Sequence, residues 1–329
     1  MRVERIAYSL GPMLTMSEVL VCAKLADRQK NVDSLWVPES WGRESFATLG
    51  ALSQVTKKVR LGTSIVSIYA RTPATVAMAA TTLDMLSYNR AIIGLGASTA
   101  AIVQNWHGIQ FTRPVDRMKE YIECLRLMIS GEKVNYDGRF FKINNFKILH
   151  QPQRTYVPIF MAAINKKMLS LASQLSDGVL LYLRPLEELK KTTNELKHST
   201  QGRSFEIATS FICALSNNDP EKARARAVKT LAFYVAVGQY YSKFLSQNGF
   251  RNEVAQISEG YSKGGADVAA KFVSDKMLNA LVICGDSEDC RKSLSKFLSA
   301  GVTLPIMQLN PVDDSETSIR EMLSTFQSA

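Results

Sequence analysis

The chain has 329 residues, of which 46% are hydrophobic, and it carries a formal net charge of +10. That length is typical of one α/β barrel with an insertion, and the hydrophobic fraction is enough for a large buried core. No apolar run approaches the roughly 18–20 residues of a membrane span, and the N-terminal MRVERIAYSLGP lacks the apolar stretch of a signal peptide. We therefore expect a soluble, cytoplasmic protein without a membrane partner.

Cysteines, histidines and basic residues exclude further classes. The five cysteines form no CxxC pair and the three histidines are scattered, so we expect reduced buried thiols and no metal site. The basic residues are spread along predicted helices without interleaved aromatics, which argues against a nucleic-acid partner. The charge favours an anionic cofactor or substrate, and the alternative is a solvated basic surface.

Strand and helix patterns alternate from end to end. The expected strands are Val3–Ser9, Ser34–Val37, Val59–Val66, Ala91–Leu95, Val157–Met161, Gly178–Leu181, Phe205–Ala214 and Val302–Leu309. The expected helices are Thr15–Gln29, Phe46–Thr56, Pro73 to about Asn89, Pro114–Ser130, Met168–Gln174, Pro185–His198 and Ser318–Phe326.

This alternation predicts an α/β protein with a TIM (β/α)8 barrel, formed by residues 1–329 as a single domain. The segment from Arg60 to Ser98 shows the unit best, because two buried strands joined by one crossover helix imply a parallel sheet. Two additions are expected. A hairpin of Lys133–Tyr136 and Phe140–Ile143 lies outside the sheet, and a mostly helical insertion, Pro220–Gly301, lies between strands 7 and 8.

The active site of such a barrel is built at the carboxyl ends of its strands. Residues at those ends are small, apolar or hydroxyl-bearing, with one carboxylate: Tyr8, Ser9, Pro38, Glu39, Ser40, Trp41, Ser64 to Tyr69, Gly96 to Ser98, Met161 to Ala163, Tyr182, Arg184 and Gln308 to Asn310. They contain no Ser-His-Asp set, no paired carboxylates and no metal cluster. A site with so few reactive groups suggests that a cofactor carries the chemistry.

Five ordered blocks resemble the luciferase-like flavin and deazaflavin barrel superfamily. They are DSLWVPESW, LGTSIVSIYARTPATVAMAATTLDMLSYNRAIIGLGAS, RPVDRMKEYIECLRLMISGEKVNYDGRFFKI, PIFMAAINKKMLSLASQLSDGVLL and GDSEDCRKSLSKFLSAGVTLPIMQL. Within the superfamily the pattern is most similar to the branch that uses coenzyme F420, especially methylenetetrahydromethanopterin reductases. The resemblance implies a homodimer formed through the second and third helices.

The resemblance also implies roles for three residues near the cofactor ring. A non-prolyl cis peptide at Ser64–Ile65 would place Ile65 behind the ring, and the alternative is an ordinary trans strand end. Glu39 would hydrogen-bond the ring edge. A carboxylate in this apolar mouth is expected to have a raised pKa and to exchange protons, unless it is a solvated loop residue.

Two loops would hold the rest of the cofactor. The residues concerned are Gly96, Ala97, Ser98, Ala162, Ala163, Ile164 and Asn165. The first loop would let backbone amides approach the hydroxylated tail, although small residues also suit tight packing. The second would cradle the tail or phosphate, with Lys166 or Lys167 beside it. Ile164 and Asn165 depart from the glycines that the family often has.

Other aromatic and acid–base positions bear on the substrate. Trp41, Trp106 and His107 are expected in loops, where the tryptophans would stack on a planar substrate and His107 would serve as acid or base. Ser40 and Thr99 replace a histidine and a glutamate of the related glucose-6-phosphate dehydrogenases, which argues against that substrate. The reductases carry acidic residues where this chain reads Gly96-Ala97-Ser98-Thr99-Ala100.

These observations predict an oxidoreductase that transfers a hydride between the C5 atom of coenzyme F420 and a small or pterin-like substrate. An FMN-dependent monooxygenase is the alternative, because the barrel is shared. A non-catalytic cofactor-binding or storage protein is a third interpretation, supported by the scarcity of acid–base residues.

Overall fold

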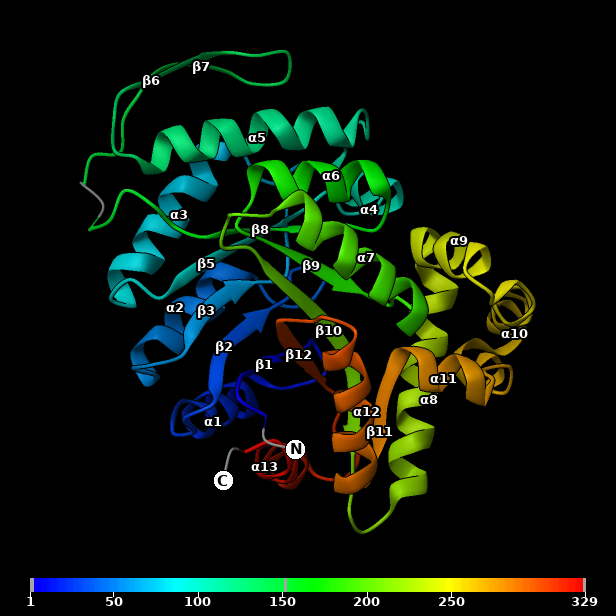
Figure 1. Cartoon of the computed structure of the whole chain (residues 1–329). Coiled ribbons are helices and arrows are strands. Elements are labelled where there is room, and N and C mark those ends of the chain that lie inside the picture. Colours follow the sequence, from blue (N-terminus) through cyan, green and yellow to red (C-terminus); the bar gives the residue numbers. More distant parts are fainter. Residues whose placement is uncertain (1–2, 151–152, 328–329) are drawn as a thin grey trace. The chain divides into compact units, whose positions relative to one another are not determined.

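The computed structural model describes residues 3–150 and 153–327 (Figure 1). These residues form two compact units. The first unit contains the described residues up to 32 together with 181–201 and those from 207 onward. The second contains 33–180 and 202–206. Each unit is built on parallel strands.

The parallel strands of the first unit lie in the order β11-β10-β12-β1. These strands are β1 (Ile6–Ser9), β10 (Glu206–Leu215), β11 (Val282–Gly285) and β12 (Leu304–Leu309). The helices of this unit are α1 (Met16–Asp27), α7 (Leu186–Ser199), α8 (Pro220–Val237), α9 (Gln239–Gln247), α10 (Arg251–Ala270), α11 (Asp275–Leu281), α12 (Ser287–Ser299) and α13 (Ser315–Thr325).

One buried side chain ties the two ends of the first unit together. The Nδ2 group of Asn31 donates to the carbonyl oxygen of Val3 at 3.0 Å and to that of Phe326 at 2.7 Å. Both bonds are buried, so they are costly to leave unmade. The N-terminal and C-terminal segments are therefore held side by side.

The second unit has a parallel sheet in the order β2-β3-β5-β8-β9, with β4 beside β5. Its strands are β2 (Val32–Val37), β3 (Arg60–Thr63), β4 (Val66–Ser67), β5 (Ala91–Gly96), β8 (Ile159–Ala162) and β9 (Gly178–Tyr182). Its helices are α2 (Ser45–Val55), α3 (Pro73–Leu86), α4 (Ala100–His107), α5 (Pro114–Ile129) and α6 (Lys166–Leu175). The antiparallel hairpin consists of β6 (Val134–Asp137) and β7 (Lys142–Phe146).

Strands β3 and β5 approach each other unusually closely. The Thr63 hydroxyl donates to the Gly94 carbonyl oxygen and accepts from the Gly94 N–H, both at 2.8 Å. A β-carbon added at Gly94 would lie 1.9 Å from the backbone oxygen of Thr63. Only glycine fits there, and this contact fixes the two strand ends that lead to the candidate site.

The order of the eight predicted strands and their helices is confirmed, and four details differ. The third strand is interrupted after Thr63 and resumes at Val66. The second hairpin strand begins at Lys142 and not at Phe140, because the Gly138 N–H bonds the Phe141 carbonyl and closes the turn between them. The insertion contains a strand, β11. Helix α10 is broken at Gly264 and Gly265.

Helix α4 was not expected, and it corrects the predicted loop placement of Trp106 and His107. The Thr99 hydroxyl accepts from the Ile102 N–H at 3.3 Å and caps the helix start. Gly108 ends the helix in the left-handed conformation, with φ of 65°. Both residues therefore belong to the last turn of a short helix.

Several other expectations have partial outcomes. All five cysteines are free thiols, and the predicted burial is confirmed for four of them, whereas Cys284 is half-buried. Among the helices in the described ranges, none has the length and apolarity to cross a membrane. The single domain and the cytoplasmic location stay predictions.

Candidate functional site

The predicted cofactor residues lie at one edge of the second unit. Glu39 follows β2, Ser64–Ile65 follows β3, Gly96 ends β5 and Ala162 ends β8. These four strands are parallel neighbours, so their carboxyl ends point the same way. The sheet therefore gathers residues that are far apart in the sequence.

Ile65, Gly96 and Ala162 come into direct proximity at this edge. A β-carbon added at Gly96 would lie 2.6 Å from Cγ1 of Ile65 and 3.5 Å from Cβ of Ala162. The Ile65 side chain thus packs over the Gly96 backbone. The predicted cis peptide at Ser64–Ile65 is confirmed. The result is an apolar surface made of one branched side chain and two small residues.

Glu39 lies in an ion pair and not in an apolar mouth. Arg71 Nε donates to its Oε1 at 3.0 Å and Arg71 Nη2 to its Oε2 at 2.8 Å. The Ser45 N–H also donates to Oε2, at 3.0 Å. The two carboxylate oxygens are therefore held by three donors.

These contacts correct the expected charge state. Burial alone raises the pKa of Glu39, but the hydrogen bonds from Arg71 and Ser45 and the charge of Arg71 outweigh it and lower the pKa. Glu39 is ionised near neutral pH. The prediction of a raised pKa was wrong, and the catalytic role of Glu39 stays a prediction.

Sequence reasoning missed Arg71. It lies in the loop between β4 and α3, 32 positions after Glu39, and its side chain also ion-pairs with Glu44. Its guanidinium carbon is 5.6 Å from the centroid of the Phe46 ring. The available signal was a lone arginine directly before Thr72-Pro73 in a strand-end loop, where parallel-sheet sites are built.

The loop after β5 turns sharply at Ser98. Ser98 has a φ of 61°, which is uncommon for a residue with a side chain. Gly96 is buried, whereas Ala97 and Ser98 are half-buried. The loop is therefore narrow and small-chained, and it leads directly into α4.

Helix α4 carries Trp106 beside Trp41 from the loop after β2. The two rings meet edge to face with centroids 5.5 Å apart. Trp41 is 57% exposed and Trp106 53% exposed, although both are large and apolar. His107 is also exposed. The tryptophans form an exposed aromatic surface within the second unit.

The loop after β8 leads into α6. Asn165 caps this helix, since its Oδ1 accepts from the Met168 N–H at 3.0 Å. Ala163 is buried and its N–H donates to Leu180, whereas Ile164 is half-buried. Lys166 and Lys167 are exposed in the first turn. A helix start with two lysines attracts an anion.

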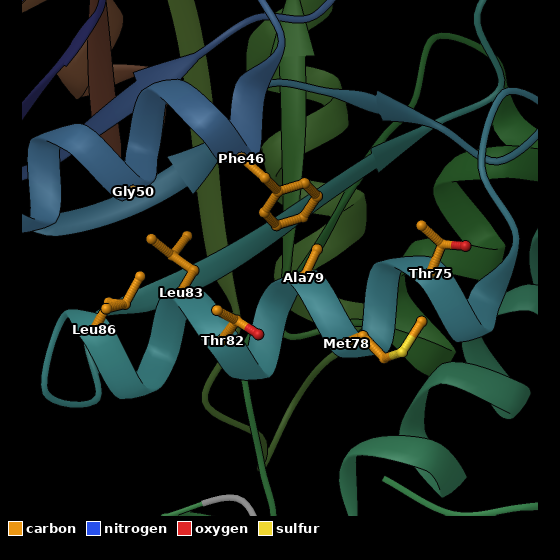
Figure 2. Close-up of a pocket in the computed structure, with 8 residues that line it drawn as sticks. All are labelled: Phe46, Gly50, Thr75, Met78, Ala79, Thr82, Leu83 and Leu86. Atoms are coloured by element: carbon orange, nitrogen blue, oxygen red, sulfur yellow. The ribbon is translucent and has the colours of Figure 1, made fainter. Parts of the chain in front are cut away.

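A cavity of about 340 Å³ lies between α2 and α3, and its lining includes Phe46, the ring beside Arg71. Its lining is mostly apolar and consists of Phe46, Gly50, Thr75, Met78, Ala79, Thr82, Leu83 and Leu86. Figure 2 shows the Phe46 ring projecting from α2 toward Ala79 of α3. We call this surface the α2–α3 groove.

Comparisons with known proteins place these features in context. Residues 5–304 match the family described as luciferase-like monooxygenase. A 5,10-methylenetetrahydromethanopterin reductase of Methanolobus tindarius is 31% identical over 290 residues, which cover 85% of this chain and 86% of the relative. A putative coenzyme F420-dependent oxidoreductase of Mycobacterium tuberculosis is 28% identical over 298 residues, covering 84% and 86%.

A solved structure confirms the fold. The coenzyme F420-dependent tetrahydromethanopterin reductase of Methanopyrus kandleri matches 98% of this chain with 97% of its own, with a TM-score of 0.86 and 23% identity. The predicted (β/α)8-barrel fold class is therefore correct.

Proposed function

Because the chain belongs to the luciferase-like monooxygenase family, we propose that it is a coenzyme F420-dependent oxidoreductase acting on a small or pterin-like substrate, as the methylenetetrahydromethanopterin reductases do. Curated relatives with those activities, each matched over most of its length, support the assignment. The observation that carries it is the apolar surface of Ile65, Gly96 and Ala162 beside an ionised Glu39.

These residues fit a flat ring with one polar edge. Because Gly96 has no side chain, the Ile65 side chain packs directly over the end of β5, and Ile65 supplies a branched apolar face against which a ring can rest. Glu39 offers a charged acceptor to an N–H or O–H at the ring edge. The loop from Ala162 to Asn165, with Lys166 and Lys167, offers an amide-rich, positive helix start to the phosphate and acidic tail.

When bound, reduced coenzyme F420 supplies a hydride from its C5 atom. The chain's own residues contribute orientation and exclusion of water. Ile65 and Ala162 would cover one face of the ring with hydrocarbon, and Glu39 would orient the ring by accepting a hydrogen bond from its edge. Because its pKa is lowered, we assign Glu39 the role of a charged acceptor that would orient the ring.

We propose that the exposed pair of Trp41 and Trp106 contacts the substrate. Trp41 and Trp106 offer a broad aromatic surface to a planar ring such as a pterin. Trp106→Ala is expected to raise KM for the substrate by roughly tenfold, the scale of one lost aromatic contact, without changing the Kd of the cofactor. Equal KM values for variant and wild type would contradict this role.

We further propose a homodimer formed through the α2–α3 groove. The groove is mostly apolar, and α3 exposes Met78 and Leu86, at 48% and 45%. Exposed apolar patches of this kind mark interaction sites. The occupant is a second copy of the chain, which presents the same surface about a twofold axis.

Titration of the purified protein with coenzyme F420 and with FMN tests the assignment. Tighter binding of F420, followed by turnover with a reducible substrate, is the expected result. Micromolar FMN binding without detectable F420 binding would favour the monooxygenase alternative. Tight F420 binding without turnover would favour a storage protein.

A further inference from the structure

The hydrogen bonds from Arg71 and Ser45 occupy three acceptor positions of the Glu39 carboxylate. A carboxylate has about four acceptor positions, two on each oxygen. Oε2 receives Arg71 Nη2 and the Ser45 N–H, whereas Oε1 receives only Arg71 Nε. Within the described residues, one acceptor position on Oε1 therefore receives no N–H donor and is left for a ligand, and the other charged group that faces Glu39 is the Glu44 carboxyl, which shares Arg71. The Glu39 side chain is 18% exposed, so a ligand can reach it.

Both donors to Glu39 are themselves fixed. The Ser45 hydroxyl donates to the Val37 carbonyl at 3.1 Å, which ties the start of α2 to the end of β2. The Arg71 backbone carbonyl accepts from the Tyr121 hydroxyl at 3.2 Å. Arg71 also holds Glu44 and lies near the Phe46 ring. The Glu39 carboxylate thus pairs with a fixed guanidinium group through two hydrogen bonds, a geometry that a lysine does not reproduce.

We infer that Arg71 is a positioning residue for the cofactor: it holds Glu39 as a fixed, ionised acceptor whose remaining Oε1 position receives an N–H or O–H group on the cofactor's ring edge. The inference rests on the proposed function and adds to it. Arg71 is the residue that sets the charge and orientation of the Glu39 side chain. The edge of the ligand that meets Glu39 must then be a hydrogen-bond donor.

A purely architectural role for Arg71 makes a different prediction. An arginine that only ties two loops together would change stability, and cofactor affinity would change by the same factor at every pH. An arginine that sets the charge of Glu39 makes affinity depend on pH once it is removed. Burial then favours the protonated carboxyl group, which loses an acceptor.

The experiment measures the Kd of oxidised coenzyme F420 from pH 5 to pH 8 for wild type, Arg71→Met, Arg71→Lys and Arg60→Met. Arg60 is a matched control, because it also pairs with a carboxylate of the second unit, Asp33 at 2.6 Å, with 26% of its side chain exposed against 20% for Arg71. The ratio of variant to wild-type Kd removes the ligand's own titration.

For Arg71→Met we expect a modest Kd ratio at pH 8, where Glu39 is still ionised. The ratio should rise toward about ten at pH 5, since affinity that needs the ionised carboxylate falls by a factor of about ten for each unit by which the pH drops below its pKa. Arg71→Lys should recover part of the loss, and Arg60→Met should give a ratio near one throughout. A ratio for Arg71→Met that is near one, or that is constant with pH, overturns the inference.

A second measurement separates this inference from the proposed function and covers a poorly folding Arg71→Met. The ionisation of Glu39 is read from the side-chain ¹³C carboxyl resonance in ligand-free wild type and Arg71→Lys. A higher pKa of Glu39 in the variant supports the role of Arg71 even if F420 is not the ligand, and an unchanged pKa overturns it. Absence of F420 binding by wild type refutes the proposed function instead.

Discussion

At the scale of single residues, the charge of Glu39 decides what the candidate site can do. Glu39→Gln keeps the size of the side chain but removes the charge that faces Arg71. We expect cofactor affinity to fall by about tenfold or more, whereas Tm should fall by only a few degrees because both partners are partly exposed. A variant that melts several degrees lower yet binds and turns over fully would make Glu39 structural.

The same pair predicts how stability depends on pH. The pKa of Glu39 is lowered in the folded protein, whereas an unfolded glutamate titrates near about 4.3. Its contribution is therefore fully present above that value and is lost as the pH falls through the lower, folded value. The difference in Tm between wild type and Glu39→Gln should be constant from pH 6 to 8 and shrink below about pH 4.

Gly96 gives a prediction about steric fit. In Gly96→Ala the new β-carbon would lie 2.6 Å from Cγ1 of Ile65, so the Ile65 side chain must move. We expect weaker F420 binding with a moderate loss of Tm, on the scale of about 1–3 kcal/mol for overpacking. The double variant Ile65→Ala with Gly96→Ala should regain Tm without regaining affinity, since the apolar face is then missing. Recovery of both would show that Ile65 is not a ring contact.

Single residues also mark the limit of sequence reasoning. The positions of Glu39, Ile65 and Gly96 at strand ends were predictable, because parallel strands bring their carboxyl ends to one edge. The pKa of Glu39 was not, because its partner lies 32 positions away in a loop whose path depends on contacts such as Tyr121 with Arg71. Charge pairing between loops has no periodic signal in a sequence.

At the scale of elements, long and strongly patterned segments were predictable and short ones were not. Helix α5 has a buried face of Met118, Tyr121, Ile122, Leu125 and Met128 and was expected. Helix α4 buries only Val103, so its sequence does not show the repeated buried positions of an amphipathic helix. Its caps, Thr99 and Gly108, were the remaining signal. Strand β11 is four residues long and directly follows a helix, which hides it.

Two substitutions of Asn165 distinguish its role as the N-terminal cap of α6 from a role at the cofactor site. Asn165→Ala removes the side-chain acceptor for the Met168 N–H and should cost about 1 kcal/mol of stability. Asn165→Asp keeps the cap and should keep Tm, but it places a negative charge where we propose that the phosphate lies. Only the aspartate variant should therefore weaken F420 binding out of proportion to stability, and unchanged Kd for that variant would remove this loop from the cofactor site.

At the scale of the whole molecule, the α2–α3 groove gives a prediction about assembly. Met78→Glu introduces a charge into an apolar surface and should convert a dimer into a monomer, as measured by light scattering after gel filtration. Leu127→Glu on α5 is a matched control, because Leu127 is also exposed, at 46%, but lies outside the groove. A wild-type monomer, or dissociation by both variants, would refute the proposed interface.

The fold as a whole was the most predictable property, because eight strands alternating with helices leave few parallel arrangements. The alternation of strands and helices does not predict which substrate the protein binds. The loops after β2 and β5 contain small side chains such as Ser40 and Ala97, and a substitution at such a position alters the space for a substrate without altering the barrel.

Because the Asn31 amide holds the two terminal segments together, the order of the strands along the chain can be changed without changing the fold. One side chain bonds both Val3 and Phe326, so a short glycine–serine linker can join these ends without displacing either. New ends can then be opened between Asn217 and Asn218, which are exposed. Such a circular permutant should keep the strand neighbours β11-β10-β12-β1 of the first unit, because none of those pairings depends on which strand comes first in the chain.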